Sequence, residues 1–298
     1  GGLAGGALLV APLRWRHRWL GLPLLLPLLW PATPRPGDGR FEAVAVDVGQ
    51  GTAVIVRTRG RLLVYDTGPM YSAESDAGER LVLPLLRARG ERRIDLLMLS
   101  HRDSDHVGGA ASVLARLPVR AMSTSLPAEH PLRAVGVPHE PCRAGQRWTW
   151  DGVHFEVLHP PSFTLAAARA NTVSCVLRIE DARGRSLLLT GDIEAAQEAA
   201  LVVQDAAALR STALLVPHHG SRTSSSAAFL DAVAPEVAVV QADYRSRFGH
   251  PAPDVLARYE ARGIPVRRSD RCGAWTWDGD GPGHCERQRS RRYWHHGP

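Results

Sequence analysis

The sequence contains no lysine, so arginine supplies every strongly basic side chain of its 298 residues. The formal net charge is nevertheless +6, which favours a polyanionic partner because arginine suits phosphate contacts. A GC-rich coding bias is the simpler explanation for the missing lysine, so the charge is weak support only. Proline, glycine and charge content give no sign of disorder throughout, and the length suffices for one large α/β domain or two small ones.

Cysteine is scarce as well. The four cysteines, Cys142, Cys175, Cys272 and Cys285, lack the C-x-x-C spacing of a zinc knuckle, so we interpret them as core residues or disulfide partners. Cys272 and Cys285 flank a run that predicts a hairpin turning at 278–279. In that register the two cysteines lie opposite one another, and a bridge between them would imply an oxidising compartment.

Long apolar runs are also missing. Residues 1–13 and 19–30 are rich in Leu, Ala, Gly and Pro, but each run is shorter than the roughly 20 residues that a helix needs to cross a bilayer. Because the chain opens on glycine, we expect it to be a fragment, with residues 1–32 the end of a membrane region and 33–40 a linker. If the basic segment RWRHRW is cytoplasmic, the positive-inside tendency places everything after it outside.

The richest group of ligand-type side chains follows an apolar run at 94–99. His101, Asp103, Asp105 and His106 stand within six residues, directly before a Gly-Gly pair that opens a helical segment. Strand ends and tight loops aim several side chains at one point, and imidazoles with carboxylates supply the donor atoms that a divalent metal needs. A solvated polar turn is the alternative, but so dense a group of ligand types favours a metal site.

Segments of strand length recur on both sides of this group. Three precede it, FEAVAVD, TAVIVRT and RLLVYDTG, and five follow it, VHFEVLHP, TVSCVLRIE, SLLLTGD, ALLVPHHGS and EVAVVQAD. Helices are predicted at 78–90, 193–209, 223–233 and 253–262. Prolines divide residues 118–150, which predicts short strands and loops there.

Four predicted strand ends carry histidine or aspartate, namely 101–106, Asp192, His218 with His219, and the loop at His250. A single histidine is more often a satisfied core or surface residue. The shared placement after an apolar strand, next to Gly or Pro, favours one common site instead. Asp47 and Asp66 also end strands beside glycine turns, and we interpret both as hydrogen-bonded scaffold residues.

Six motifs carry a resemblance to a known family. DVGQG, DTG, SHRDSDHVGG, LLTGD, VPHHGS and FGHP occur in this order over residues 41 to about 278. In this the chain resembles the metallo-β-lactamase superfamily, and within it the C-terminal domain of ComEC-type DNA-uptake channel proteins. The resemblance implies an α/β fold, an αββα sandwich over residues 41–287, preceded by a short apolar membrane-associated segment. Residues 288–298 are expected to be a disordered basic tail in which His295 and His296 face solvent.

The resemblance also implies the metal ligands, which by position are His101, Asp105, His106, Asp192 and His219, with His218 as the alternative to His219. Two features depart from the superfamily. Asp103 stands where a second histidine is common, and the histidine usual on the middle strand is missing. Asn171 and Ser174 lie near that place, and His159 lies upstream. Because Asp103 is a hard anion, Mn²⁺ or Mg²⁺ is favoured, with Zn²⁺ as the alternative.

The function implied is metal-dependent hydrolysis of DNA phosphodiester bonds outside a membrane channel, with degradation of the strand that is not imported. Asp103 or Asp105 would orient the attacking water, and His250 would contact a phosphate or protonate the leaving oxygen. These three residues are the predicted catalytic groups.

Partners follow from the same resemblance. They are DNA, the membrane channel of the same polypeptide and other competence proteins, with this domain on the periplasmic or extracellular side of the inner or cell membrane. Arg222, Arg245 and Arg247 would hold the DNA backbone, although ordinary solvated arginines explain them equally well. Two alternatives stay open. One is a catalytically degenerate DNA-guiding or gating domain, and the other is a hydrolase of small esters or lactams.

Overall fold

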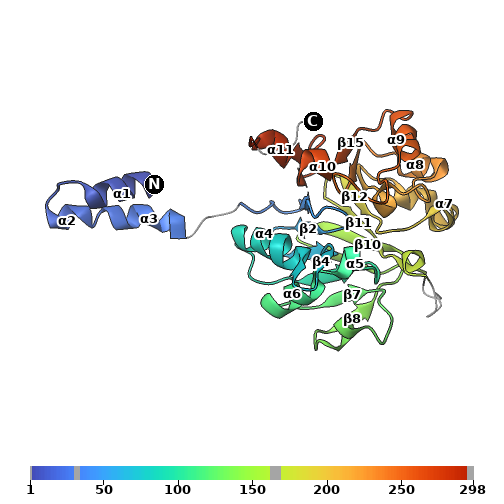
Figure 1. Cartoon of the computed structure of the whole chain (residues 1–298), viewed down its shortest axis with the longest axis horizontal. Helices are drawn as coiled ribbons and strands as arrows, with labels where there is room; N and C mark the ends of the chain where they lie inside the picture. Colours follow the sequence, from blue (N-terminus) through green and yellow to red (C-terminus); the bar gives the residue numbers. More distant parts are fainter. Residues whose placement is uncertain (1, 30–33, 162–168, 294–298) are drawn as a thin grey trace. The chain divides into compact units, whose positions relative to one another are not determined.

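The computed structural model describes residues 2–29, 34–161 and 169–293, which fall into two compact units (Figure 1). One unit comprises Gly1–Pro34 and Leu86–Glu91, and the other comprises the rest of the chain. The first contains three short helices, α1 (Gly2–Val10), α2 (Trp15–Arg18) and α3 (Gly21–Leu29). No helix in the described part of the chain is long and apolar enough to cross a membrane. The membrane assignment of residues 1–32 therefore stays a prediction, and residues 30–32 lie outside the described ranges.

The second unit is built on two large sheets. The first sheet has the order β17-β16-β1-β2-β3-β6-β7-β8. Its strands are β1 (Glu42–Ala45), β2 (Val54–Arg57), β3 (Leu62–Tyr65), β6 (Leu96–Leu99), β7 (Met122–Thr124), β8 (His139–Pro141), β16 (Trp275–Trp277) and β17 (His284–Cys285). A small hairpin of β4 (Met70–Ser72) and β5 (Ser75–Asp76) stands apart from it.

The second sheet has the order β15-β14-β13-β12-β11-β10-β9. Its strands are β9 (Arg147–Trp150), β10 (Val153–His159), β11 (Val176–Glu180), β12 (Ser186–Leu189), β13 (Ala213–Leu215), β14 (Val237–Val240) and β15 (Val266–Arg268). Strands β12 to β15 run parallel to one another, whereas β9 to β12 are antiparallel. Both sheets are thus mixed, as the family resemblance implies.

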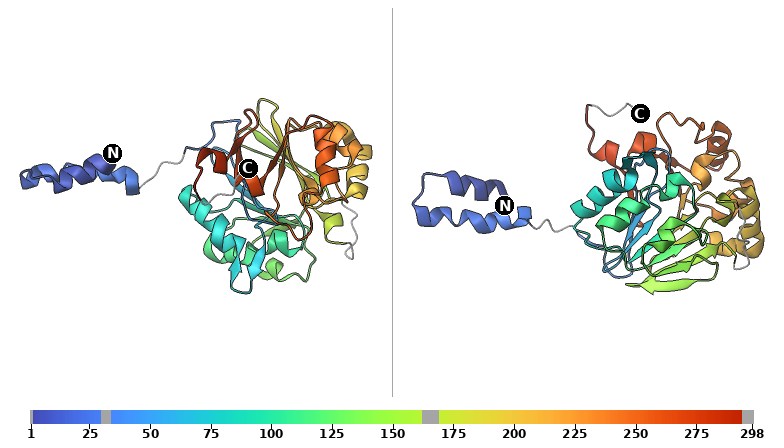
Figure 2. Two further views of the ribbon diagram at one scale, coloured as in Figure 1. Left: turned by 45° about the horizontal axis from the view of Figure 1, so that its top comes forward. Right: turned by 60° about the horizontal axis from the view of Figure 1, so that its bottom comes forward.

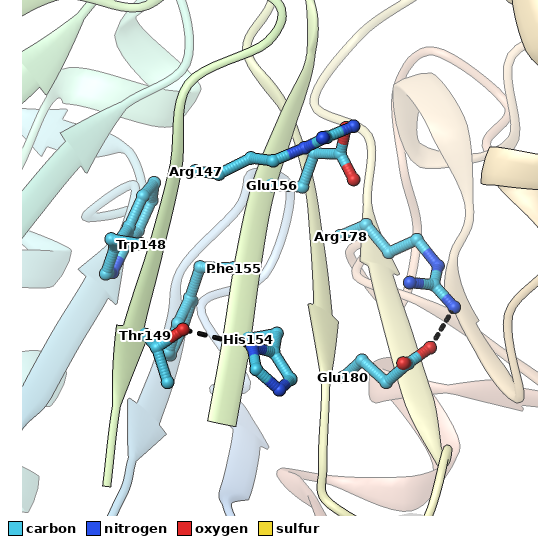
Figure 3. Close-up of a pocket in the computed structure, with 8 residues that line it drawn as sticks. All are labelled: Arg147, Trp148, Thr149, His154, Phe155, Glu156, Arg178 and Glu180. Atoms are coloured by element: carbon cyan, nitrogen blue, oxygen red, sulfur yellow. Dashed lines mark hydrogen bonds and ion pairs between the residues drawn. The ribbon is translucent and has the colours of Figure 1, made fainter. Parts of the chain in front are cut away.

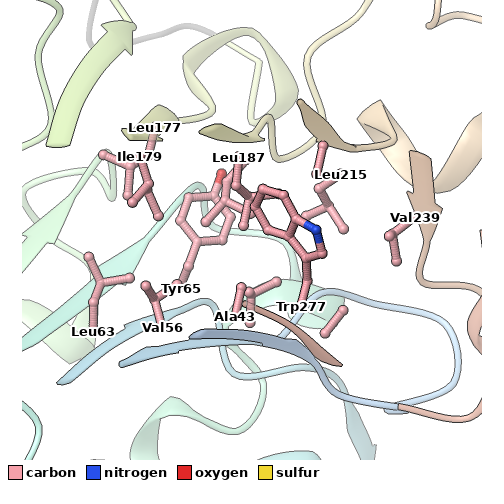
Figure 4. Close-up of a cluster of buried hydrophobic side chains, with 14 of the residues drawn as sticks. Ala43, Val56, Leu63, Tyr65, Leu177, Ile179, Leu187, Leu215, Val239 and Trp277 are labelled. Carbon is pink, nitrogen blue, oxygen red and sulfur yellow. The ribbon is translucent and has the colours of Figure 1, made fainter. Parts of the chain in front are cut away.

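The main core lies between the two sheets, where apolar side chains from both meet (Figure 4). Val56, Leu63 and Trp277 come from the first sheet, and Leu187 and Leu215 come from the second. All five are buried, and each such side chain contributes about 1.5–3 kcal/mol on burial. The predicted face-to-face arrangement of two sheets is therefore confirmed.

Helices cover the outer faces of the sandwich (Figure 2). Along β12, Leu187 and Leu189 point into the main core while Leu188 packs on the other side with the helices, which is why three consecutive positions of this strand are apolar. The covering helices of the second sheet are α7 (Ala195–Leu209), α8 (Ala227–Val233) and α9 (Pro253–Glu260). The remaining helical segments are η1 (Gly78–Val82), α4 (Leu83–Ala88), α5 (Ser104–Val107), α6 (Ala110–Arg116), η2 (Pro131–Ala134), η3 (Asn171–Val173), η4 (Pro217–Gly220), α10 (Ser269–Cys272) and α11 (Glu286–Arg289).

The C-terminal hairpin differs from the prediction in its register. Cys285 pairs with Trp275, whereas Cys272 ends the short helix α10 instead of standing opposite Cys285 in a strand. The predicted disulfide is nevertheless confirmed, since Cys272 and Cys285 are bonded with their Cα atoms 4.7 Å apart. The helix α10 turns back toward the strand and places Cys272 within reach.

Two further features concern the remaining cysteines and the tail. Cys142 and Cys175 form a second disulfide, for which the sequence left both roles open. Helix α11 extends into the segment predicted as a basic tail. His295 and His296 lie outside the described residues.

Candidate metal centre

Four side chains from three strand ends converge on one point. Asp105, His106, Asp192 and His219 each offer a ligand atom, and these atoms all lie within 4.8 Å of one another. His106 Nε2 is 3.1 Å from Asp192 Oδ1 and 3.2 Å from His219 Nε2. His219 Nε2 is 3.3 Å from Asp105 Oδ2. The structure thus brings together four of the six predicted ligands in a set of two imidazoles and two carboxylates.

Close backbone approach places the first two ligands. Asp105 and His106 lie in α5, directly after β6, and the Gly108-Gly109 pair follows them. A Cβ atom at Gly108 would lie 2.1 Å from the Met70 backbone nitrogen, and one at Gly109 would lie 2.4 Å from that of Gly78. Only glycine therefore fits between α5 and α6, because the neighbouring backbone occupies the space of a side chain.

An unusual turn places the other histidines. His218 and His219 follow β13 and both adopt left-handed backbone conformations, with φ of +50° and +53°. Such values are uncommon for residues other than glycine. The turn directs the buried His219 into the cluster, while Asp192 reaches it from the end of the adjacent strand β12.

The outer nitrogens of both cluster histidines are held by acceptors. His219 Nδ1 lies 2.9 Å from the Gln241 carbonyl oxygen, and His106 Nδ1 lies 2.7 Å from Asp66 Oδ2. Because a carbonyl or a carboxylate only accepts, each Nδ1 carries a proton, and each ring turns its Nε2 atom toward the cluster. The two Nε2 atoms face one another at 3.2 Å. Although burial lowers the pKa of His106, the carboxylates of Asp192 and Asp66 hold it well above its usual value, so a proton lies between the two nitrogens in the metal-free site. A divalent metal would take the place of that proton, and the residues present fit such an ion.

His101 and His218 approach the other side of Asp192. Their Nε2 atoms lie 4.0 Å and 3.7 Å from Asp192 Oδ2, and His101 Nε2 is also 3.6 Å from Asp103 Oδ2. Among the described residues, the buried Nε2 of His101 has no hydrogen-bond partner, and neither has Asp192 Oδ1. Asp192 therefore stands between two groups of donor atoms, one at each of its oxygens.

The charges of the cluster suit a cation. Burial alone would raise the pKa of the Asp105 carboxyl, but a hydrogen bond from His219 and the charge of His106 lower it to about 2. The imidazole of His101, whose Nε2 lies 3.6 Å from Asp103 Oδ2, lowers the pKa of Asp103. Against the effect of burial, His106 and His219 hold the pKa of Asp192 well below its usual value. All three carboxylates are therefore ionised at neutral pH.

His250 lies beside the cluster on its accessible side. Its ring centroid is 5.7 Å from that of His218 and 6.5 Å from that of His219. Burial and the two neighbouring histidines lower its pKa, so its imidazole is neutral at pH 7. The structure thus places the predicted catalytic histidine next to the predicted ligands.

The three predicted DNA-binding arginines occupy two different places. Arg245 and Arg247 lie in the loop that leads to His250, with their guanidinium groups over the rings of Tyr244 and Phe248. Arg222 follows the HHG turn, and its Nε lies 3.4 Å from Asp254 Oδ1 at the exposed surface.

Ser174, which lies near the expected place of the missing histidine, contacts two residues of the site. Its hydroxyl oxygen accepts the backbone N–H of Asp192 at 3.1 Å and lies 3.3 Å from His101 Nδ1. Asn171 instead donates to Glu194 Oε1, and His159 Nδ1 bonds to the Ser174 carbonyl oxygen outside the cluster. Of the three residues near that place, Ser174 alone contacts Asp192 and His101 in these bonds.

Asp66 has a larger part in the site than the sequence suggested. It is a hydrogen-bonded scaffold residue, as predicted, but its partners are the Ser100 N–H, the Ser100 hydroxyl and the ligand His106. On the other side, His218 Nδ1 lies 3.2 Å from the Thr223 hydroxyl, which donates to Glu194 Oε1 at 3.1 Å. The sequence signals for Asp66 were its position at a strand end beside a glycine turn and the DTG motif that it begins.

Comparison with known proteins identifies the family. Residues 46–242 match the metallo-β-lactamase superfamily. The chain belongs to this superfamily. It is 42% identical over 247 residues to Competence protein ComA of Neisseria gonorrhoeae, covering 83% of this chain and 33% of that protein. It is 32% identical over 256 residues to ComE operon protein 3 of Bacillus subtilis strain 168, covering 78% of this chain and 32% of that protein.

The chain thus spans about a third of the length of these curated relatives. Among solved structures it resembles the metallo-β-lactamase fold protein YhfI of Bacillus subtilis, with a TM-score of 0.50 and 10% identity over 80% of this chain and 99% of that one. At that identity the likeness shows the fold alone. Fold, family and the histidine and aspartate cluster together indicate a metal-dependent hydrolase domain that binds a divalent cation.

A pocket of about 400 Å³ lies elsewhere on this superfamily domain, on β9, β10 and β11 (Figure 3). Its arginines are ion-paired with neighbouring glutamates, Arg147 with Glu156 and Arg178 with Glu180. None of its lining residues belongs to the metal cluster. The pocket is therefore separate from the candidate site.

Proposed function

We propose that this domain is a metal-dependent phosphodiesterase that hydrolyses DNA during DNA uptake. The observation that carries the proposal is the set of converging imidazole nitrogens and ionised carboxylates at Asp105, His106, Asp192 and His219, beside a loop that bears two arginines. Similarity to Competence protein ComA supports DNA as the substrate.

The donor set guides the choice of metal. Asp105, His106, Asp192 and His219 would hold one ion, and His101, Asp103 and His218 surround the position for a second beside Asp192 Oδ2. Mixed oxygen and nitrogen donors favour Mn²⁺ or Mg²⁺, with Zn²⁺ as the alternative. A divalent ion bound there supplies hydroxide near neutral pH and stabilises charge on the phosphate.

The side chains around the cluster orient water and substrate. Asp103, about half exposed and ionised, is available to accept a hydrogen bond from the attacking water, with Asp105 as the second candidate. His250, neutral at pH 7, would donate a hydrogen bond from its ring N–H to a phosphate oxygen, whereas protonation of the leaving sugar oxygen would require its imidazolium form. Arg245 and Arg247 contribute positive charge along the path of the DNA backbone.

Location and partners belong to the same proposal. We place the domain on the periplasmic or extracellular side of the inner or cell membrane, with residues 1–32 membrane-associated. Its partners are a membrane channel of the same polypeptide and other competence proteins. The two disulfides support this placement, because structural disulfides persist in oxidising compartments.

A nuclease assay tests the activity. The purified 298-residue chain is incubated with Mn²⁺ and end-labelled linear single-stranded DNA. Cleavage is expected, and it is expected to be lost in Asp105→Ala and Asp192→Ala. Arg147→Ala, on the separate β9 surface, serves as the matched control and retains activity.

Other outcomes have defined meanings. No cleavage with Mn²⁺, Mg²⁺ or Zn²⁺, together with no tightly bound metal, would refute the phosphodiesterase and favour the DNA-guiding alternative, for which Ser174 in place of a histidine is the supporting observation. Turnover of nitrocefin without DNA cleavage would favour hydrolysis of small lactams.

A further inference from the structure

We propose that Tyr244 and Phe248 form a base-stacking platform at the edge of the metal centre, which selects unpaired nucleotides over duplex DNA. The platform lies in the loop of residues 243–250, between β14 and α9. This inference rests on the proposed phosphodiesterase function and names the strand form that the site accepts.

The first observation is the exposure of two large rings. Phe248 is 56% exposed and Tyr244 is 47% exposed, although aromatic side chains are normally well buried. Each ring carries a cation, since the Arg247 guanidinium lies 4.8 Å from the Phe248 centroid and that of Arg245 lies 5.4 Å from the Tyr244 centroid. Two cation-bearing rings within five residues combine a stacking surface with charge that is complementary to phosphate.

The second observation is the alignment of Phe248 with the metal centre. Its ring is 5.8 Å from that of His250 at an interplanar angle of 28°, and the His250 ring is 6.5 Å from that of the ligand His219 at 23°. Three rings, each tilted by less than 30° from the next, therefore lead from the surface to the cluster. A base stacked on Phe248 would continue this series and place its strand at the edge of the cluster that holds His219 and Asp105.

The third observation is that the loop is held in place. The Ser246 hydroxyl donates to Gln50 Oε1 at 2.9 Å, which ties the loop to the DVGQG turn. The backbone N–H of Phe248 donates to Ser246 Oγ, and that of Gly249 to the Ser246 carbonyl oxygen. A platform that is ordered before binding loses little conformational freedom when a base settles on it.

These contacts define the ligand by its chemistry. Every nucleobase has a flat π-face, but only an unpaired base can offer it to a side chain, because duplex bases are stacked on one another. Loss of one aromatic stacking partner typically weakens single-strand binding by about 5- to 150-fold, with little dependence on sequence. The platform therefore predicts a preference for single strands and frayed ends, without sequence specificity.

The test compares strands with and without bases. Steady-state cleavage is measured on a labelled oligothymidine and on an abasic strand with the same backbone. Phe248→Leu, which keeps apolar volume but removes the π-face, is expected to raise KM for oligothymidine by about 5- to 150-fold with kcat nearly unchanged. Its cleavage of the abasic strand should stay at the wild-type level. Phe248→Trp should restore the wild-type KM.

Controls separate the platform from a general effect of aromatic residues. Tyr244→Leu is expected to act in the same direction as Phe248→Leu, whereas Tyr293→Leu, at a residue that is 94% exposed outside the loop, should behave as wild type. An unchanged KM in Phe248→Leu, or an equal loss on the oligothymidine and the abasic strand, would overturn the platform.

Equilibrium binding distinguishes failure of the platform from failure of the proposed activity. Fluorescence anisotropy of the labelled oligothymidine is measured in EDTA, where no hydrolysis occurs. Phe248-dependent binding by a wild-type chain that cleaves nothing would support the platform and refute the phosphodiesterase. Normal cleavage, together with binding that does not depend on Phe248, would support the phosphodiesterase and refute the platform.

Discussion

Asp66→Asn perturbs the metal centre without removing a ligand. Asp66 is fully buried, and its oxygens accept the Ser100 N–H at 2.7 Å, the Ser100 hydroxyl at 2.6 Å and His106 Nδ1–H at 2.7 Å. Asparagine has the same shape but only one acceptor oxygen, so its NH₂ group must face either Ser100 N–H or His106 Nδ1–H. In the second case His106 moves its proton to Nε2, which then has no lone pair for a metal.

The expected magnitude follows from this change of tautomer. Loss of a hydrogen-bond partner behind a metal ligand typically costs 10- to 100-fold in affinity, or about 1.4 to 2.8 kcal/mol. Competition titration with a fluorescent chelator would measure the Mn²⁺ dissociation constant of both proteins, and nuclease activity should fall in parallel at limiting metal.

Asp181→Asn is the matched control for this experiment. Asp181 is also buried, but it accepts the backbone N–H groups of Arg183 and Arg185 at the other end of β11 from Ser174. The Asp181→Asn substitution should lower the free energy of unfolding and leave the affinity for Mn²⁺ unchanged. Wild-type affinity in Asp66→Asn, or an equal loss in both variants, would refute the account of how His106 is oriented.

Three further predictions concern protons, stability and the disulfide. Burial lowers the pKa of His106, but Asp192 and Asp66 hold it well above its usual value overall, so the metal-free site carries a proton that a metal must displace. The affinity for the metal should therefore rise with pH, and calorimetry in two buffers should show proton release. Metal binding that does not depend on pH would contradict this. When a metal is present at a hundred times its Kd, its removal with EDTA lowers the free energy of unfolding by about 2.7 kcal/mol, so the Tm should fall by roughly 5 to 10 °C. An unchanged Tm would count against a metal bound in the folded state. Thiol labelling of the unfolded, unreduced chain should leave Cys272 and Cys285 unmodified, and labelling of both would exclude the bridge.

Much of the fold could be predicted because apolar strands ending in Asp, His or Gly are local patterns. The strand pattern predicted β12, β13 and β14, and the shared placement of histidine and aspartate at strand ends predicted that Asp192, His219 and residues 101–106 belong to one site. The face-to-face arrangement of the two sheets that brings these strand ends together depended on the family resemblance, because no local pattern reports how two sheets face each other.

Other features were beyond local reasoning. Strand β15, Val266–Arg268, carries two arginines and lacks apolar alternation. The predicted register of the C-terminal hairpin was wrong because Cys272 lies in α10 and not in a strand. The orienting role of Asp66 depends on a partner 40 residues away in sequence, and only the three-dimensional structure shows which nitrogen of His106 it holds.

The measurement that tests the central claim most directly is the metal content of the protein after dialysis against Mn²⁺, determined by element-resolved mass spectrometry. The wild-type chain is predicted to retain at least one ion per molecule, and His219→Ala and Asp192→Ala are predicted to retain far less while staying folded. The account would be contradicted by a folded wild-type chain that retains no Mn²⁺, Mg²⁺ or Zn²⁺, or by variants that retain as much metal as the wild type.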